Sequence, residues 1–196
     1  QTIIFDLPRF IIFDDVELFN NNCLNALLKI IEEPSKNNFF VLLNNKSKPL
    51  IETIKSRCLD IKIILNEKKR QNIITSLIEK FTINMIIDQE TSKLTPGNFI
   101  KFNYIFDKSQ ISLNENFLDN LEILLNLYKK DKDVMFIDMI SFLTDNYFTD
   151  IKNKNLLTNE KIFEYKRFFF ENIDKFFLYN LNQNALLNSL NNKIND

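Results

Sequence analysis

Three short apolar runs near the start of the chain, two of them separated by a segment with helical spacing, constrain its fold more than any other feature. The runs combine β-branched and aromatic residues, as buried strands do, and they span 9–13, 39–43 and 61–65. Between the first two, leucine and isoleucine recur on one helical face, at Leu24, Leu27, Leu28 and Ile31. Pro34 then ends that helical pattern. The order strand, helix, strand predicts a parallel sheet covered by helices, which is the α/β class.

After about residue 66 the strand patterns stop, and helical spacing continues to the end of the sequence. The first of these helices has one apolar face, made of Ile74, Leu77, Ile78 and Phe81. A longer apolar stripe follows in a later helix, at Phe117, Leu118, Leu121, Leu124, Leu125 and Tyr128. The predicted helices span 67–80, 84–93, 97–107, 114–129, 133–147, 159–180 and 183–192. The whole chain is therefore expected to be α/β followed by an all-α bundle.

The composition excludes several kinds of site. A loop that cradles phosphate in the G-x-x-x-x-G-K-[ST] manner needs at least two glycines, and Gly97 is the only one. With no His and only Cys23 and Cys58, the sequence lacks the ligands of a structural zinc site. The 25 basic residues nearly balance the 26 acidic ones, so no overall positive field attracts nucleic acid. Because no signal peptide or membrane span is evident, we expect a cytoplasmic protein with reduced thiols.

Two adjacent carboxylates, Asp14 and Asp15, directly follow the first predicted strand. A parallel strand delivers the residues after it to the carboxyl edge of the sheet, where ligands bind. Paired carboxylates at such an edge hold Mg²⁺ and orient water in nucleotide hydrolases. Taken alone, the pattern also fits acidic residues in an ordinary loop or helix start.

The motifs that follow this acidic pair resemble the AAA+ clamp-loader family. Residues 25–34 read NALLKIIEEP and match its N-A-L-L-K-x-x-E-E-P helix, and residues 56–58 reproduce its S-R-C motif. Further matches are the Walker B pair at Asp14 and Asp15 and the first sensor at Asn44 or Asn45. The resemblance covers residues 9–65 and is specific, because separate motifs recur in the correct order and at the correct separations.

The resemblance implies that Arg57, with Ser56 beside it, is an arginine finger that reaches the γ-phosphate bound by a neighbouring subunit. Such a finger stabilises charge on the transferring phosphoryl group, and lysine substitutes poorly because it lacks the planar fork. Only four of the 25 basic residues are arginine, so an arginine at this position is informative. The competing interpretation is a surface arginine that pairs with Glu52 or Asp60.

The resemblance further implies a family member that does not hydrolyse ATP. In the segment LTPGNFIKF, Asn98 and Phe99 stand where ATPase members carry a second sensor arginine. Together with the missing phosphate loop, this favours a subunit that binds no nucleotide by itself, while ATP and Mg²⁺ are bound by its neighbour. The acidic pair and the sensor asparagines would then be vestigial cofactor-binding residues. In that case we expect the acidic pair to cap the following helix and to pack locally.

By the same resemblance the chain has three parts. These are the rear half of an AAA+ parallel-sheet domain at 1–66, a small helical lid at 67–109 and a helical collar at 110–196. The collar would contact the other clamp-loader subunits, of the gamma/tau and delta types, in an assembly that loads the sliding clamp onto primed DNA. The collar is richer in aromatic residues than one small core requires, which predicts that some face a partner. The residues concerned are Phe168, Phe169, Phe170, Phe176, Phe177 and Tyr179.

A modest basic cluster offers a route to direct contact with the primer–template DNA. It comprises Lys48, Lys55, Lys68, Lys69 and Arg70. Lysines at the start of a helix are more often only solvated, so an indirect role at DNA is the competing interpretation.

Two other interpretations of the function remain open. The chain opens at Gln1 inside an apolar run, so its first part is expected to be absent. A phosphate loop in that part would make the protein a gamma/tau-type clamp-loader ATPase, with Asp14 and Asp15 as working metal ligands. A helical adaptor unrelated to replication would require three motifs to coincide by chance.

Overall fold

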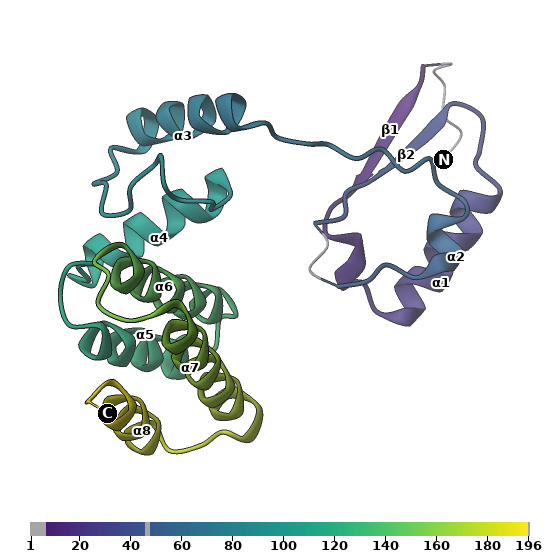
Figure 1. The fold of residues 1–196 in the computed structure, drawn as a ribbon. Helices are drawn as coiled ribbons and strands as arrows, with labels where there is room; N and C mark the ends of the chain where they lie inside the picture. Colours follow the sequence, from purple (N-terminus) through teal and green to yellow (C-terminus); the bar gives the residue numbers. More distant parts are fainter. Residues whose placement is uncertain (1–6, 46–47, 196) are drawn as a thin grey trace. The chain divides into compact units, whose positions relative to one another are not determined.

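The computed structural model describes residues 7–45 and 48–195 of the chain. It divides between Ile64 and Leu65 into an N-terminal unit that contains a sheet and a C-terminal unit made of helices (Figure 1). This order of elements agrees with α/β followed by all-α. The finer division at residues 66 and 109 into sheet domain, lid and collar stays a prediction.

In the described residues, the sheet of the N-terminal unit consists of two parallel strands, β1 (Arg9–Phe13) and β2 (Asn38–Leu42). Their register places Phe10 opposite Phe39. Helix α1 (Asn21–Glu32) forms the crossover between them. The strand, helix, strand pattern read from the sequence is therefore confirmed.

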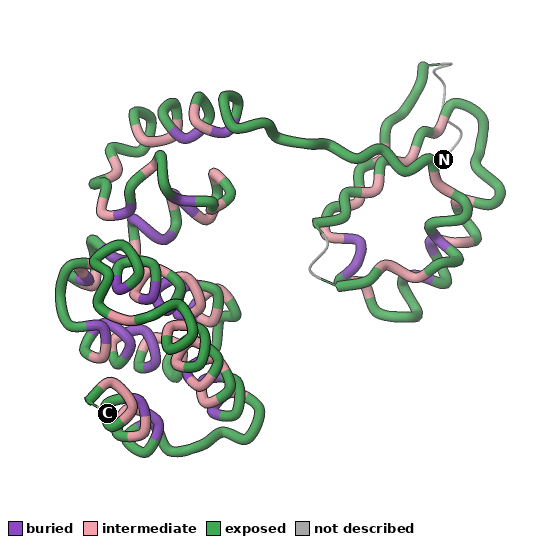
Figure 2. Tube along the Cα trace, in the orientation of Figure 1, coloured by how far each residue is buried: buried purple, intermediate pink, exposed green. Residues whose placement is uncertain are grey.

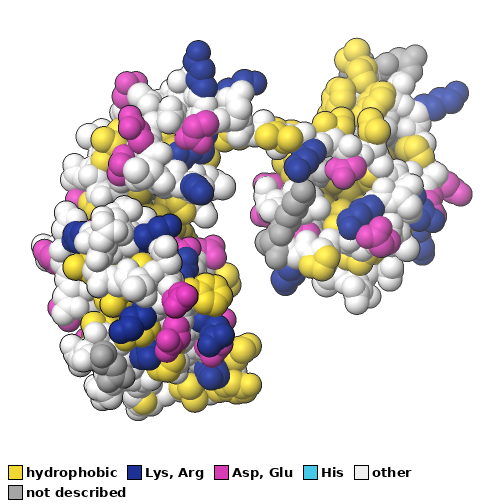
Figure 3. Space-filling model, viewed as in Figure 1, with side chains coloured by type: hydrophobic (Ala, Val, Ile, Leu, Met, Phe, Trp, Pro, Cys, Tyr) yellow, Lys and Arg dark blue, Asp and Glu magenta, His cyan; other side chains and the backbone are white. Residues whose placement is uncertain are grey.

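One face of this sheet is covered and the other is open. The covered face packs on α1 and on the short helix α2 (Glu52–Lys55), and the cluster buried there contains Val16, Leu24, Leu27 and Ile54. On the open face, the rings of Phe10 and Phe39 stack with centroids 5.3 Å apart, yet the two residues are 65% and 52% exposed. Hydrophobic side chains accordingly gather on the surface over β1 and β2 (Figure 3). A parallel sheet is ordinarily covered on both faces, so this open face is an atypical surface.

The prediction of a third strand at 61–65 is wrong. These residues have no regular secondary structure, and Ile61 and Ile63 are 72% and 89% exposed. A strand forms only where a neighbouring strand pairs with its backbone N–H and C=O groups, and in the described ranges β1 and β2 pair only with each other. The apolar pattern identified a segment suited to a sheet, but its pairing partner is not among the described residues.

The C-terminal unit contains six helices within the described residues. They are α3 (Glu67–Phe81), α4 (Pro96–Lys108), α5 (Phe117–Asp131), α6 (Met135–Asn153), α7 (Asn159–Tyr179) and α8 (Gln183–Asn195). Each corresponds to a predicted helix, with the largest shift at the C-terminus of α6. The predicted helix at 84–93 is the exception, because residues 83–95 form an irregular connection between α3 and α4.

Aromatic and aliphatic side chains from α3 to α8 form the core of this unit. Figure 2 shows the buried positions along these helices. The stripe predicted on α5 is confirmed, because its residues are either fully buried or packed against the buried ones. On α3, however, Ile74 is completely buried while Phe81 is 55% exposed. This difference arises because α3 makes its main helix contact with α4 alone, at the edge of the unit.

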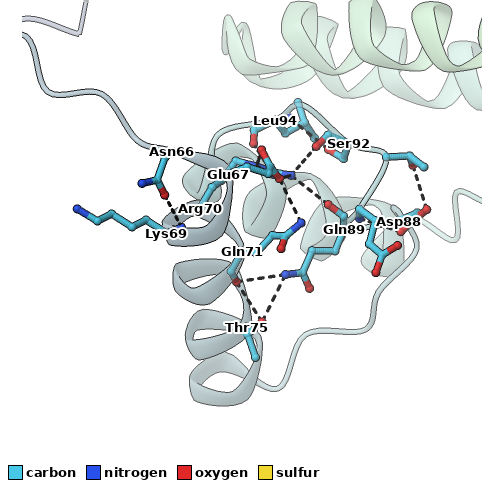
Figure 4. A network of polar contacts seen from close by, with 12 residues as sticks. Asn66, Glu67, Lys69, Arg70, Gln71, Thr75, Asp88, Gln89, Ser92 and Leu94 are labelled. Atoms are coloured by element: carbon cyan, nitrogen blue, oxygen red, sulfur yellow. Dashed lines mark hydrogen bonds and ion pairs between the residues drawn. The ribbon is translucent and has the colours of Figure 1, made fainter.

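The irregular connection 83–95 is held by a buried arginine. Arg70 is 7% exposed, and its guanidinium donates to the carbonyls of Gln89, Ser92 and Leu94 at 3.0, 2.7 and 2.9 Å (Figure 4). The same guanidinium donates to the Glu67 carboxylate at 2.8 to 3.2 Å. Arg70 is therefore a structural residue, and its assignment to a surface basic cluster is wrong.

A buried asparagine holds the other end of this connection. Asn103 on α4 is completely buried, and its Oδ1 accepts from the amides of Ile86 and Ile87 at 2.7 and 2.9 Å. Its Nδ2 donates to the Phe99 carbonyl at 2.8 Å. Buried backbone N–H and C=O groups require hydrogen-bond partners. In a helix these partners would be other backbone groups of the same segment. In this connection, Arg70 and Asn103 supply them instead.

The helices begin and end on characteristic residues. At the N-termini of α1, α3, α4, α5 and α7, an Asn or Thr side chain accepts a backbone N–H, at Asn20, Asn66, Thr95, Asn116 and Thr158. At the C-termini of α3, α5 and α7, the residue after the helix adopts a left-handed conformation, at Thr82, Lys132 and Asn180. Glycine adopts this left-handed conformation more easily than other residues. The only glycine, Gly97, lies inside α4, so these three positions are occupied by residues that have a side chain.

The aromatic residues of α7 divide between core and surface. Phe169 and Phe176 are buried, and Tyr179 is 71% exposed. The other three of the predicted set are half-buried. Contact of the exposed rings with a partner stays a prediction. Even α7, at 21 residues, is not apolar enough to cross a bilayer, and the same holds for every helix in the described ranges.

Candidate functional site

The carboxyl ends of β1 and β2 lie side by side, because the two strands are adjacent and parallel. Their pairing continues beyond the strands, where the Leu43 N–H donates to the Phe13 carbonyl at 2.8 Å. The residues that follow the two strands are therefore brought to one edge of the sheet. They are Asp14 and Asp15 after β1, and Asn44 and Asn45 after β2.

A contact between Asp15 and Asn45 joins the two strand ends. Asn45 Nδ2 donates to Asp15 Oδ1, and the Asp15 N–H donates to Asp14 Oδ1 at 3.0 Å. Asp15 is half-buried with φ 48°, a left-handed conformation that aspartate tolerates better than most residues. Both Asp14 and Asn44 are exposed. The structure thus brings the predicted Walker B and sensor residues together, although no group of three or more His, Cys, Asp or Glu in the described residues could hold a metal ion.

The predicted capping role of the acidic pair is wrong. Asp15 precedes the short 3₁₀ helix η1 (Val16–Leu18), and its side chain makes no cap hydrogen bond there. The N-terminus of α1 is capped instead by Asn20, whose Oδ1 accepts from the Cys23 N–H at 2.9 Å. Because η1 separates the aspartates from α1, neither lies at the start of that helix.

The second group of predicted site residues surrounds the C-terminus of α2. Arg57 Nη1 donates to the Thr53 carbonyl at 2.8 Å, and Ser56 Oγ donates to the same carbonyl at 3.1 Å. The last carbonyls of a helix have no intrahelical N–H partner, so both side chains cap α2. Arg57 Nη1 also lies 3.3 Å from Ser56 Oγ. The Arg57 side chain remains 39% exposed.

Arg57 also forms an ion pair with Glu32, the last residue of α1. The distance between Arg57 Nε and Glu32 Oε1 is 2.6 Å, and the Glu32 side chain is 46% exposed. The sequence suggested Glu52 or Asp60 as the intramolecular partner, but Glu52 pairs with Lys55 at 2.7 Å. The ion pair therefore links the E-E-P helix to the S-R-C turn.

The third residue of the S-R-C turn faces the apolar cluster of the N-terminal unit. Cys58 is half-buried and packs against the buried residues around Ile54. Burial raises the pKa of the Cys58 thiol above its usual value, because desolvation disfavours the thiolate. Cys58 is thus a packing residue with a protonated thiol at neutral pH.

Comparison with known proteins identifies the family. Residues 5–67 match the family described as DNA polymerase III, delta subunit. The delta prime subunit of DNA polymerase III from Buchnera aphidicola of Acyrthosiphon pisum is 28% identical over 194 residues, which cover 93% of this chain and 56% of that protein. Its counterpart from Buchnera aphidicola of Baizongia pistaciae is 30% identical over 152 residues, which cover 70% of this chain and 44% of that protein. These matches support the assignment of the chain to the delta prime subunits of DNA polymerase III.

Two further facts qualify the match to the delta prime family. The DNA polymerase III gamma subunit from Buchnera aphidicola of Schizaphis graminum is 33% identical over 84 residues, which cover 42% of this chain and 23% of that protein. The chain spans about half the length of the delta prime relatives it matches.

The residues expected at the second sensor position have structural roles. Phe99 is completely buried in the core of the C-terminal unit. The Asn98 N–H donates to Thr95 Oγ1 at 3.3 Å, as part of the cap of α4. Neither side chain supplies the cation that the second sensor carries in ATPase members.

Sequence reasoning missed two contacts. It placed Arg70 in a basic cluster, yet Arg70 is buried and Lys55 is paired with Glu52. It also did not connect Glu32 with Arg57. A signal for Arg70 was present, because arginine is rare in a lysine-rich chain and Glu67 precedes Arg70 by one helical turn.

Proposed function

We propose that the chain is part of a non-hydrolysing delta prime subunit that supplies Arg57 to the ATP site of a neighbouring clamp-loader subunit. In this role it would help the assembly load the sliding clamp onto primed DNA during replication. ATP and Mg²⁺ would be bound by the neighbour, of the gamma/tau type, and contact with primer–template DNA would be indirect.

The observation that carries this proposal is the exposed position of Arg57 at the end of α2. Two contacts to its own helix end orient the side chain, and the 39% exposure leaves it accessible to another molecule. A guanidinium that meets phosphate in this way can bind two oxygens with its planar fork. In related phosphoryl-transfer systems, removal of such an arginine lowers the rate of phosphoryl transfer by roughly 10³–10⁵-fold.

Two further features support a subunit without its own nucleotide chemistry. The single glycine cannot build a phosphate loop within this sequence. One Asp15 oxygen is engaged by Asn45, and one Asp14 oxygen accepts from the Asp15 amide. We assign residues 67–109 to a lid and residues 110–196 to a collar that contacts the gamma/tau and delta subunits, in keeping with the all-helical C-terminal unit.

The test is the Arg57→Ala variant of the complete subunit in a reconstituted clamp loader. We expect DNA-stimulated ATP turnover to fall by more than about tenfold, because one transition-state charge contact is lost. Arg9→Ala is the matched control, since Arg9 is also an exposed arginine of the same unit, and its side chain donates a hydrogen bond to Asn38 Oδ1 rather than to a helix end. Unchanged turnover in Arg57→Ala would rule out the finger.

A gamma/tau-type ATPase is the second candidate, favoured by the match to the gamma subunit from Schizaphis graminum's Buchnera. In that case the complete protein contains a phosphate loop, and Asp14 and Asp15 bind Mg²⁺. Equilibrium dialysis of the complete protein with labelled ATP separates the two. Binding that is lost in Asp14→Asn would support the ATPase, and absence of binding would support the non-hydrolysing subunit.

A further inference from the structure

We propose that Glu32 is a positioning residue for Arg57, which holds the guanidinium in the orientation needed to meet a phosphate on the neighbouring subunit. This inference rests on the proposed finger role of Arg57. The finger role of Arg57 does not by itself explain the E-E-P sequence at the end of α1. The positioning role gives that end of the helix a function.

The contacts of Arg57 hold its guanidinium at two of its nitrogens. Glu32 Oε1 lies 2.6 Å from Nε, and Nη1 is bound to the Thr53 carbonyl at 2.8 Å. Because Nε–H and Nη2 share one edge of a guanidinium, the Glu32 carboxylate at Nε sets the direction of that edge, and the Thr53 carbonyl sets the direction of Nη1. The Arg57 side chain is still 39% exposed, so a phosphate oxygen can approach it while these two contacts are kept.

The two residues that hold Arg57 stand on helices anchored to the same core. Glu32 ends α1, whose Leu24 and Leu27 are buried, and Thr53 is in α2, whose Ile54 is buried in the same cluster. The helices α1 and α2 also contact each other directly. Groups on such rigid elements restrict a long side chain that otherwise samples many rotamers, which is how a site becomes pre-organised.

The exposure of the ion pair between Glu32 and Arg57 indicates that it orients the Arg57 side chain rather than stabilises the fold. The two side chains are 39% and 46% exposed, and ion pairs at such positions contribute little to folding because water screens them. Substitution of Glu32 should therefore leave the fold and the assembly intact. What it should change is the fraction of time that the guanidinium has the orientation needed to meet a phosphate.

The experiment uses the complete subunit in the reconstituted clamp loader, with Glu32→Ala and Glu32→Gln compared in wild-type and Arg57→Ala backgrounds. In the wild-type background we expect kcat for DNA-stimulated ATP hydrolysis to fall on the order of tenfold, with KM for ATP unchanged. In the Arg57→Ala background we expect no further loss, because the residue that Glu32 positions is gone. Glu33→Gln is the matched control, since Glu33 is the adjacent exposed glutamate.

The outcomes separate this inference from the function on which it rests. If Arg57→Ala itself leaves turnover unchanged, the finger role fails and the positioning role fails with it. If Arg57→Ala lowers turnover while both Glu32 variants do not, only the positioning role is overturned. If the Glu32 variants lower turnover equally in both backgrounds, Glu32 is structural and the inference is also overturned. Gel filtration of each variant complex checks assembly, and Glu32→Gln serves if Glu32→Ala does not assemble.

Discussion

Replacement of Arg70 by alanine tests whether one buried guanidinium determines the path of the connection between α3 and α4. The change removes the partner of three carbonyls, those of Gln89, Ser92 and Leu94. A hydrogen bond that involves a charged group contributes about 1.5–3 kcal/mol, and a buried polar group left without a partner costs about 1–3 kcal/mol. The bonds to Glu67 add little, because that side chain is 62% exposed.

We therefore expect Arg70→Ala to lower the free energy of unfolding of the C-terminal unit by about 3–4 kcal/mol. Urea unfolding followed by far-ultraviolet circular dichroism measures this quantity, because the helices of that unit dominate the signal. Arg70→Lys should recover less than half of the loss, since one ammonium group cannot replace a planar fork that reaches three carbonyls.

Lys69→Ala is the matched control for Arg70→Ala. Lys69 is the adjacent cation, its side chain is exposed, and its removal should change the unfolding free energy by less than about 0.5 kcal/mol. Hydrogen exchange gives a second measurement, because the amides of residues 83–95 should exchange faster in Arg70→Ala. If Arg70→Ala behaves like Lys69→Ala in both assays, the assignment of the connection to this network is refuted.

Three more predictions concern residues near this network and the two thiols. Hydrogen bonds from Arg70 hold the pKa of Glu67 below its usual value, so the charged form stabilises the fold above the unfolded-state pKa and this stabilisation is lost as pH falls through the folded-state pKa. Wild type should be more stable than Glu67→Gln in urea at neutral pH, and the difference should vanish in acid; a difference that grows in acid would contradict the sign. Asn103→Ala should cost about 2–4 kcal/mol, because the amides of Ile86 and Ile87 lose their buried acceptor; a cost below about 1 kcal/mol in urea unfolding would argue against it. Cys23 should react with a thiol reagent faster than Cys58, since Cys23 is exposed and burial raises the pKa of Cys58; the opposite order in timed labelling would exclude this account.

The elements that the sequence predicts well are those whose determinants are local. Helix α1 has its apolar residues on one face, an asparagine cap at its start and a proline just beyond its end. Helix α5 is similar, with Asn116 as its cap and an apolar stripe that enters the core. In both cases the period and the cap agree, so no distant residue is needed to decide the outcome.

Residues 84–93 have helical periodicity but do not form a helix, because one local and several distant hydrogen bonds favour an irregular backbone. Asp88 accepts from the Glu90 N–H at 2.9 Å and from Thr91 Oγ1 at 3.0 Å, which offers the backbone an alternative to helical bonds. Arg70 and Asn103 then supply the remaining partners from α3 and α4. The aspartate was visible in the sequence, but the two distant partners could not be predicted without the fold.

The sequence predicted which residues belong to the candidate site, but it did not predict all of the contacts among them. The residues after β1 and β2 meet because the strands are adjacent and parallel, a relation that the strand, helix, strand order already implies. The ion pair between Glu32 and Arg57 depends on the angle at which α2 approaches α1. No periodic pattern encodes that angle, so the partner of Arg57 was assigned to nearer residues.

The left-handed residues that follow α3, α5 and α7 affect the thermal stability of this protein. An L-residue in that conformation brings its β-carbon close to a carbonyl oxygen, at a cost of roughly 1–2 kcal/mol, and the cost is greatest for a β-branched residue such as Thr82. Glycine at Thr82, Lys132 and Asn180 would remove this crowding without any change in the buried side chains. The melting temperature of the C-terminal unit is thus limited in part at three solvent-facing positions, where it can be raised independently of how its interior is packed.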